Sequence, residues 1–200
     1  MTGTLQRLTV IAALLAVVGC ASSQEPLGGY EQVAPAAVLE SPDPEETAYP
    51  TDRVEHGRYL VELLGCGNCH TDGALIGEPD ATRLLAGSAV GIAWSNPLEV
   101  RNPGVVYPSN LTSDPQTGIG DWSVWQIVAM LQSGVDDHGG RPLPIMPRVA
   151  YSKLQTEDAT AIAMYLKSLP AVDHKVPANV RPGQRARHPF VHFGVYRSRQ

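Results

Sequence analysis

The chain has 200 residues, three cysteines and a formal net charge of −5. Only two of the cysteines lie close together, so the second ligand pair of a typical structural zinc site is missing. No internal repeat is evident, and the region with clear helix signals, residues 51–170, has the size of one domain.

A short apolar run near the start of the chain predicts export. It extends from Leu8 to Val18, which is too short to span a bilayer but fits the core of a signal peptide. The following Gly19-Cys20 resembles a bacterial lipobox, in which the cysteine becomes the lipid-modified first residue of the mature protein. We therefore expect a lipoprotein-type signal peptide at residues 1–19 and a lipid anchor at Cys20. An ordinary cleavage site with an incidental cysteine is the alternative.

Residues 21–50 predict a tether. They include five prolines and six acidic residues, and they contain no lysine or arginine. This composition favours an extended chain that repels itself. Together with the anchor, residues 20–50 would hold a folded domain close to the periplasmic side of a bacterial membrane.

The sequence Cys66-Gly67-Asn68-Cys69-His70 places two thiols and an imidazole within five residues. A structural zinc site would have to recruit His56 or His138, and neither belongs to a second ligand pair. A thioredoxin-like redox pair usually accompanies a βαβ pattern, which is not visible here. The remaining interpretation is covalent attachment of a c-type haem. Both thiols would bond to the porphyrin edge, and His70 would bind the iron.

Three amphipathic helices are predicted, with glycine- and proline-rich loops between them. The first spans residues 52–64, with Asp52 as its cap. The second spans residues 121–134, with Asp121 as its cap, and the third spans residues 156–170. The sequence therefore predicts a small all-α domain with one haem at the centre of its core.

Three sequence blocks resemble the class I c-type cytochromes. They are GRYLVELLGCGNCHTDG (57–73), YPSNLTSDPQTGIGDWSVWQIVAMLQSGV (107–135) and RPLPIMPRVAYSKLQTEDATAIAMYLKSLP (141–170). The greatest similarity is to the haem domains of cytochrome subunits that accompany periplasmic alcohol, aldehyde and sugar-acid dehydrogenases in bacteria. This resemblance implies a small helical fold around one covalent haem c. Residues 78–106 and the tail after Pro170 fit the family pattern poorly.

The resemblance also implies a sulfur ligand on the far side of the iron. Met130 and Met164 fall inside predicted helices, where methionine usually fills gaps in the core. Met146 lies between prolines in a segment that cannot be helical. We therefore expect Met146 to be the distal ligand, as in Met/His electron-transfer cytochromes. His138 is the rival ligand.

Two further sets of residues carry weaker signals. The family crosses its first and last helices at the positions of Gly57 and Tyr165, where glycine would permit close approach. The ring N–H of His70 should donate to a backbone carbonyl, for which residues 79–86 are a guess.

Asn110, Thr112 and Trp122 lie in the block that the resemblance places along the haem. They could hydrogen-bond the haem propionates. For Trp122, simple packing in the core is an equal alternative.

The C-terminal extension, residues 171–200, is basic, with six lysines and arginines and a single acidic residue. It could wrap the domain as a solvated extension. It could also serve as a docking arm for an acidic partner. Because the chain is predicted to be exported, nucleic acid is not an expected partner.

These observations predict a membrane-tethered cytochrome c with one haem. It would carry single electrons between exported redox partners, such as a dehydrogenase or a terminal oxidase, and would not be an enzyme. One alternative is a haem enzyme or gas sensor with an open or labile distal site, which the coordination state of the iron would reveal. The other is a fixed electron-transfer subunit of a dehydrogenase complex, which co-purification would reveal.

Overall fold

The computed structural model describes residues 40–97, 99–134 and 145–194. The expected signal peptide, the anchor at Cys20, most of the tether and the rival ligand His138 lie outside these ranges. The described residues all belong to one compact unit of the chain, Val33–Gln200.

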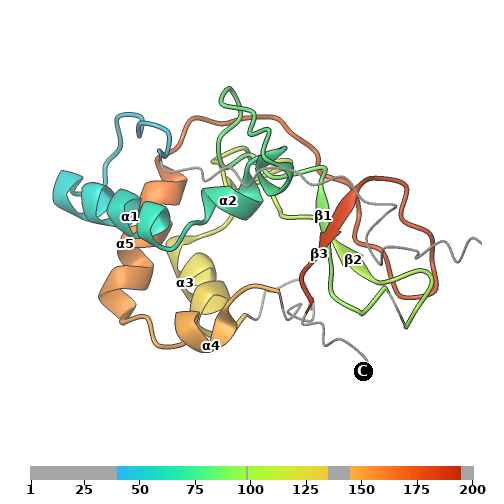
Figure 1. Cartoon of the computed structure of the whole chain (residues 1–200). Helices are drawn as coiled ribbons and strands as arrows, with labels where there is room; N and C mark the ends of the chain where they lie inside the picture. The colour runs from blue at the N-terminus through green and yellow to red at the C-terminus, as the bar shows by residue number, and fades with distance from the viewer. Residues whose placement is uncertain (1–39, 98, 135–144, 195–200) are drawn as a thin grey trace, which may run out of the picture. The chain divides into compact units, whose positions relative to one another are not determined.

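The described part of the chain contains helices and a small sheet (Figure 1). In chain order the elements are α1 (Thr51–Leu63), α2 (Gly67–His70), the short 3-10 helix η1 (Ala74–Ile76), β1 (Gly91–Ala93), β2 (Val105–Val106), α3 (Val124–Ser133), α4 (Arg148–Tyr151), α5 (Thr156–Lys167) and β3 (Phe190–His192). Helices α1 and α3 both pack against α5, and the strands lie away from α1 (Figure 1). Within the described ranges, no helix combines the length and the apolar character that crossing a membrane requires.

The three predicted helices are present, but two of the predicted caps are wrong. Helix α1 begins directly after Pro50, so Asp52 lies inside the first turn. There its negative charge interacts favourably with the positive end of the helix dipole and stabilises the helix. Helix α3 is capped by Ser123 instead of Asp121. The Ser123 hydroxyl accepts from the amide of Gln126, and the Gln126 side chain accepts from the amide of Ser123, which forms a capping box.

The predicted end of α3 and start of α5 are confirmed. Gly134 ends α3 with a φ of 65°, in the left-handed region that glycine adopts without strain. Helix α5 begins at Thr156 and ends at Lys167. It stops short of Pro170, because the residue before a proline is disfavoured in helical geometry.

Helices α1 and α5 cross at Gly57, which confirms the predicted crossing. A Cβ atom added to Gly57 would lie 2.0 Å from the carbonyl oxygen of Ala161 and 2.8 Å from Cβ of Tyr165. No side chain fits at such distances, so only glycine permits this approach. Tyr165 is fully buried, and its hydroxyl donates to the carbonyl of Pro42 over 2.7 Å.

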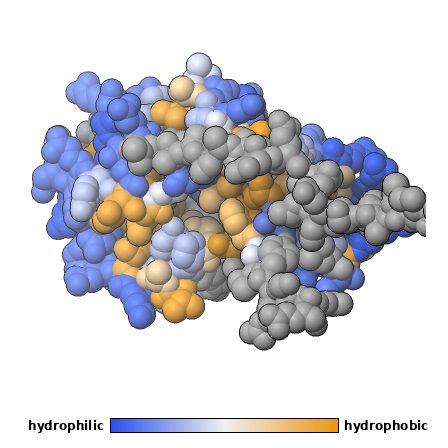
Figure 2. Space-filling model, viewed as in Figure 1, coloured by the Kyte–Doolittle hydropathy of each residue, from blue (hydrophilic) through white to orange (hydrophobic). Residues whose placement is uncertain are grey.

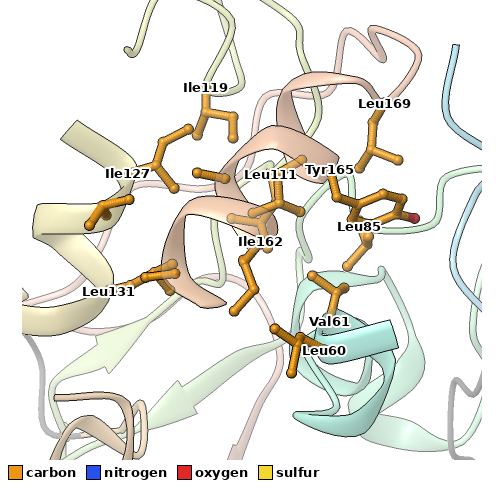
Figure 3. Packing of buried hydrophobic residues seen from close by; sticks show 14 of the residues in the cluster. Leu60, Val61, Leu85, Leu111, Ile119, Ile127, Leu131, Ile162, Tyr165 and Leu169 are labelled. Atoms are coloured by element: carbon orange, nitrogen blue, oxygen red, sulfur yellow. The ribbon is translucent and has the colours of Figure 1, made fainter. Parts of the chain in front are cut away.

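The hydrophobic core is formed by α1, α3, α5 and the loops beside them (Figure 3). Its labelled members are Leu60, Val61, Leu85, Leu111, Ile119, Ile127, Leu131, Ile162, Tyr165 and Leu169. Met130 and Met164 pack against this core while remaining partly exposed. Their predicted role as core residues is confirmed.

The sheet corrects the all-α prediction, because the fold contains strands as well as helices. Strand β1 pairs antiparallel with β2, with Ile92 opposite Val106, and parallel with β3, with Ile92 opposite Val191. The strand order is β2-β1-β3. Strands β1 and β2 come from residues 78–106 and β3 comes from the C-terminal extension. The two stretches that fit the cytochrome pattern poorly therefore pair with each other.

The last part of the expected tether is folded against the helices. Ser41 is buried, and its amide donates to Oε1 of Glu62 over 3.1 Å. The Arg58 guanidinium donates to the Ser41 carbonyl over 2.9 Å and pairs with Asp43 over 2.7 Å. Ser41 and Asp43, which belong to the expected tether, therefore contact α1, where Arg58 offsets part of the acidic charge of the segment.

Candidate functional site

The two neighbouring cysteines lie at the start of α2. Gly65 has a φ of 66°, a left-handed conformation that turns the chain from α1 into α2. Cys66 precedes the first residue of α2, and Cys69 lies inside the helix. Side chains three positions apart on a helical turn lie on the same side of it. The two residues are half-buried free thiols.

The environment of these thiols differs from that of a reactive redox pair. Burial, with a smaller contribution from the charge of Cys69, raises the pKa of Cys66 to about 11. Burial also raises the pKa of Cys69. Thioredoxin-like pairs instead lower the thiol pKa in order to form the nucleophilic thiolate. The pKa shifts therefore do not support the thioredoxin-like alternative.

The ring of His70 is fixed by one hydrogen bond to the backbone. Its Nδ1 lies 2.7 Å from the carbonyl oxygen of Ser109. A carbonyl can only accept, so Nδ1 carries the proton and Nε2 keeps its lone pair. Burial lowers the pKa of His70, which favours this neutral ring. Within the described residues, no hydrogen-bond partner contacts Nε2.

The expected donation from His70 to a backbone carbonyl is confirmed, but the guess of residues 79–86 is wrong. The acceptor is Ser109, from the loop before α3. The chain just after residues 79–86 contacts the backbone of His70 instead, because the amide of Gly87 donates to the His70 carbonyl over 2.8 Å.

Asn110 follows Ser109 directly, and its buried amide uses every hydrogen-bonding position. Its Nδ2 donates to Thr117 Oγ1 over 3.1 Å and to the carbonyl of Val172 over 2.7 Å. Its Oδ1 accepts from the amide and the hydroxyl of Thr112, over 2.9 Å and 2.7 Å. This leaves no bond for a propionate. The side chain instead holds the backbone at Ser109.

Trp122 precedes α3 in the sequence, and Met146 follows it. Trp122 is half-buried and packs against the hydrophobic core just before α3 begins. Met146 is also half-buried, but it is not part of that core, and it lies two residues before α4.

One side chain of helix α4 is influenced by the two thiols. Its last residue, Tyr151, is buried. Burial, with smaller contributions from the charges of Cys66 and Cys69, raises the pKa of Tyr151 to about 12. The Tyr151 side chain therefore lies within electrostatic range of the two thiols.

The described residues supply no additional ligand for a structural zinc site at the two cysteines. Within the described ranges, no three His, Cys, Asp or Glu side chains gather in an arrangement that could hold a metal ion. His56 is engaged elsewhere, because its Nε2 lies 2.9 Å from Oδ1 of Asp158 and links α1 to α5.

Curated proteins of known activity provide a comparison, although no protein-family model matches the chain. The fructose dehydrogenase cytochrome subunit of Gluconobacter japonicus is 35% identical over 123 residues, which cover 60% of this chain and 23% of that protein. The gluconate 2-dehydrogenase cytochrome c subunit of Pantoea cypripedii is 36% identical over 127 residues, which cover 58% of this chain and 26% of that protein. The chain is a relative of the cytochrome c subunits of bacterial dehydrogenases.

The chain is also similar to a third protein, a diheme cytochrome. The diheme cytochrome c-type protein of Cereibacter sphaeroides is 36% identical over 155 residues, which cover 74% of this chain and 44% of that protein. The chain thus spans less than half the length of each of these three relatives. The resemblance to cytochrome subunits that was expected from the three sequence blocks is confirmed.

In the chain described here, the two neighbouring cysteines and His70 fit a covalently attached haem. Two free thiols three positions apart are followed directly by an imidazole. The hydrogen bond from His70 to Ser109 leaves Nε2 unprotonated, as an iron ligand requires. The donor set and its protonation therefore match the chemistry of a c-type site.

Three residues near the site were not predicted from the sequence. Ser109 and Val172 contribute backbone carbonyls, which every residue carries, so no side-chain signal marks them. Tyr151 lies in the third block of the family resemblance, and an apolar spacing with Ala150 and Leu154 could have marked it as a buried residue.

Proposed function

We propose that the chain is an electron-transfer cytochrome c. Cys66 and Cys69 would attach the haem by thioether bonds, and Nε2 of His70 would bind the iron. The observation that carries this proposal is the geometry of His70, whose ring is held by Ser109 next to two free thiols. The names of the relatives support it. Haem bound here would supply one-electron chemistry at its iron.

Met146 is the proposed second axial ligand. The residue is half-buried outside the core, and Tyr151 of α4, which follows it in the sequence, lies within electrostatic range of the thiols. With His70 and Met146 both on the iron, no position would remain for a substrate or a gas. This arrangement favours an electron carrier over the alternatives of a haem enzyme or a gas sensor. Trp122, packed on the core nearby, is proposed to line the cofactor.

The proposal includes a class I cytochrome domain over residues 51–170 with a single haem. The chain carries one C-x-x-C-H motif, so one haem is the number that its sequence supports. Helices α1 and α5, crossing at Gly57, are consistent with the class I arrangement of first and last helices.

The proposed partner is a dehydrogenase on the periplasmic side of a bacterial membrane. Relatives of the chain are named as cytochrome subunits of dehydrogenases, which supports this class of partner. Large apolar side chains are exposed in three of the helices: Leu63 in α1, Trp125 in α3 and Val149 in α4. Figure 2 shows hydrophobic residues gathered on the face viewed in Figure 1. Exposed apolar groups of this kind support a contact with another protein.

A fixed subunit of a dehydrogenase complex is the second candidate, because relatives carry the word subunit in their names. A mobile carrier would purify alone, whereas a fixed subunit would co-purify with a larger dehydrogenase chain. Co-purification therefore distinguishes a mobile carrier from a fixed subunit, and either result is compatible with the proposed haem site.

Replacing both cysteines, in the double variant Cys66→Ser/Cys69→Ser, is expected to abolish covalent haem. The reduced parent should show the absorption bands of haem c and keep its haem after extraction with acidified acetone, because thioether bonds survive that treatment. The double variant should lose all of its haem to the solvent. The variant His56→Gln is the control, since His56 bonds to Asp158 away from the motif, and it should keep the haem. A parent that loses its haem on extraction would contradict the proposal.

Replacing Cys20 with serine is expected to release the protein from the membrane fraction. One acyl chain gives only marginal binding, whereas two or more chains anchor stably, and a lipobox cysteine carries several. Fractionation of cells followed by immunoblotting measures the change, with Ser22→Ala as the control. A Cys20→Ser protein that stays entirely in the membrane fraction would show that the anchor lies elsewhere.

A further inference from the structure

The start of the C-terminal extension is bonded to the loop that supports His70. The carbonyl of Val172 accepts from Nδ2 of Asn110 over 2.7 Å, and the Val172 amide donates to Oγ1 of Thr112 over 3.2 Å. Two residues later, the amide of His174 donates to Oγ1 of Thr117 over 3.0 Å. Residues 172–174 therefore bond to both ends of the loop from Asn110 to Thr117.

The same extension also contacts the chain on the other side of His70. Nδ1 of His174 lies 2.7 Å from the carbonyl oxygen of Ala86. The next residue, Gly87, donates its amide to the His70 carbonyl over 2.8 Å. A Cβ added at Gly87 would lie 2.5 Å from Cγ1 of Val176, so the extension packs tightly against this point. The extension thus contacts both segments that bond to His70.

We propose that Asn110 is a positioning residue that couples the C-terminal extension to His70. Its amide is the point at which the two segments meet, because it bonds to Thr112 and Thr117 in the loop and to Val172 in the extension. Ser109 precedes Asn110 directly, so the anchored side chain fixes the carbonyl that accepts from the His70 ring. This inference rests on the proposed function, since it gives the extension a role in tuning the iron ligand.

The direction of the effect follows from ligand chemistry. A hydrogen bond from the outer ring nitrogen of a ligating histidine makes the ring a stronger donor. A stronger donor stabilises oxidised iron more than reduced iron. Loosening the Ser109 carbonyl should weaken the bond from His70, and the reduction potential should rise.

The test uses the full-length haem protein with Asn110→Ala. Two readouts are expected to change together: the midpoint potential shifts upward, and the Nδ1 proton of His70 exchanges faster with solvent in NMR spectra of the reduced protein. Asn102→Ala is the first control, because Asn102 also bonds to the extension, at the Gly183 carbonyl over 3.4 Å, but lies outside this network. Tyr165→Phe is the second, because it removes a partly buried hydrogen bond elsewhere. Neither control should change either readout.

Thr117→Val keeps the test decisive if Asn110→Ala fails to fold. It removes the oxygen that accepts from Asn110 and from His174, and it leaves the other bonds of Asn110 in place. A smaller upward shift and a smaller increase in exchange are expected. If the variants that fold keep the potential and the exchange rate of the parent, Asn110 only stabilises the fold and the coupling is overturned. A parent without covalent haem would instead overturn the proposed function.

Discussion

Replacing Met146 with histidine is expected to lower the reduction potential by on the order of 0.2 V, a fraction of the range of about 0.8 V that axial ligands control. A thioether is a soft, weak donor that favours reduced iron, whereas imidazole is a stronger donor to oxidised iron. The haem should remain attached, because Cys66 and Cys69 are unchanged. Potentiometric titration of the purified protein measures the shift.

The companion variant Met146→Ala should leave the distal position open. Its reduced form is expected to bind carbon monoxide rapidly, while the parent resists it. Met130→Ala is the matched control, because Met130 packs against the core from α3 and its loss should lower stability without opening the iron. If the parent binds carbon monoxide readily and Met146→Ala changes neither potential nor spectrum, Met146 is not the ligand. The gas sensor or enzyme interpretation would then be favoured, and His138 would be the next residue to replace.

Replacing Gly57 with alanine is expected to lower the free energy of unfolding by about 3 kcal/mol or more, at the upper end of overpacking effects. The added methyl group would lie 2.0 Å from the carbonyl oxygen of Ala161, which is backbone and cannot rotate away. Helices α1 and α5 must therefore move apart. Urea unfolding, followed by circular dichroism, gives the change.

The control for this substitution is Glu55→Ala, two residues earlier on the exposed side of α1. It should change the free energy of unfolding by less than about 0.5 kcal/mol, as surface substitutions usually do. A loss below about 1 kcal/mol for Gly57→Ala would show that the two helices separate at little cost.

The helices were predictable because their signals are local. Apolar residues such as Val54, Leu60 and Val61 recur at helical spacing, and all three are buried. The cap of α3 was also present in the sequence, since Ser123 and Gln126 have the spacing of a capping box. Asp121 is an equally good cap former, and only the backbone geometry distinguishes it from Ser123.

The sheet was not predictable by the same means. Its strands are two or three residues long, which is too short to show an alternating pattern. Their pairing joins residues that are far apart in sequence, and no local signal marks such partners. The sequence could show only that both stretches depart from the cytochrome pattern.

The sequence predicted which side chains form the site, but it did not predict what surrounds them. The two thiols and His70 follow from a five-residue motif. The surroundings of His70 depend on backbone carbonyls at Ser109 and Val172, which become visible only when distant segments meet. Asn110 was identified in the sequence, but its hydrogen bonds are made to Thr112, Thr117 and Val172 of the protein itself.

The parallel pairing of β1 with β3 has a consequence for the order in which the domain folds. Gly91 pairs with Phe190, so the contact closes a very long loop, whereas the helices form from neighbouring residues. Contacts of high sequence separation form slowly, and β3 follows all the other described elements in the sequence. Helices α1, α3 and α5 can associate before β3 exists. The sheet is therefore expected to form only after the helical core has assembled.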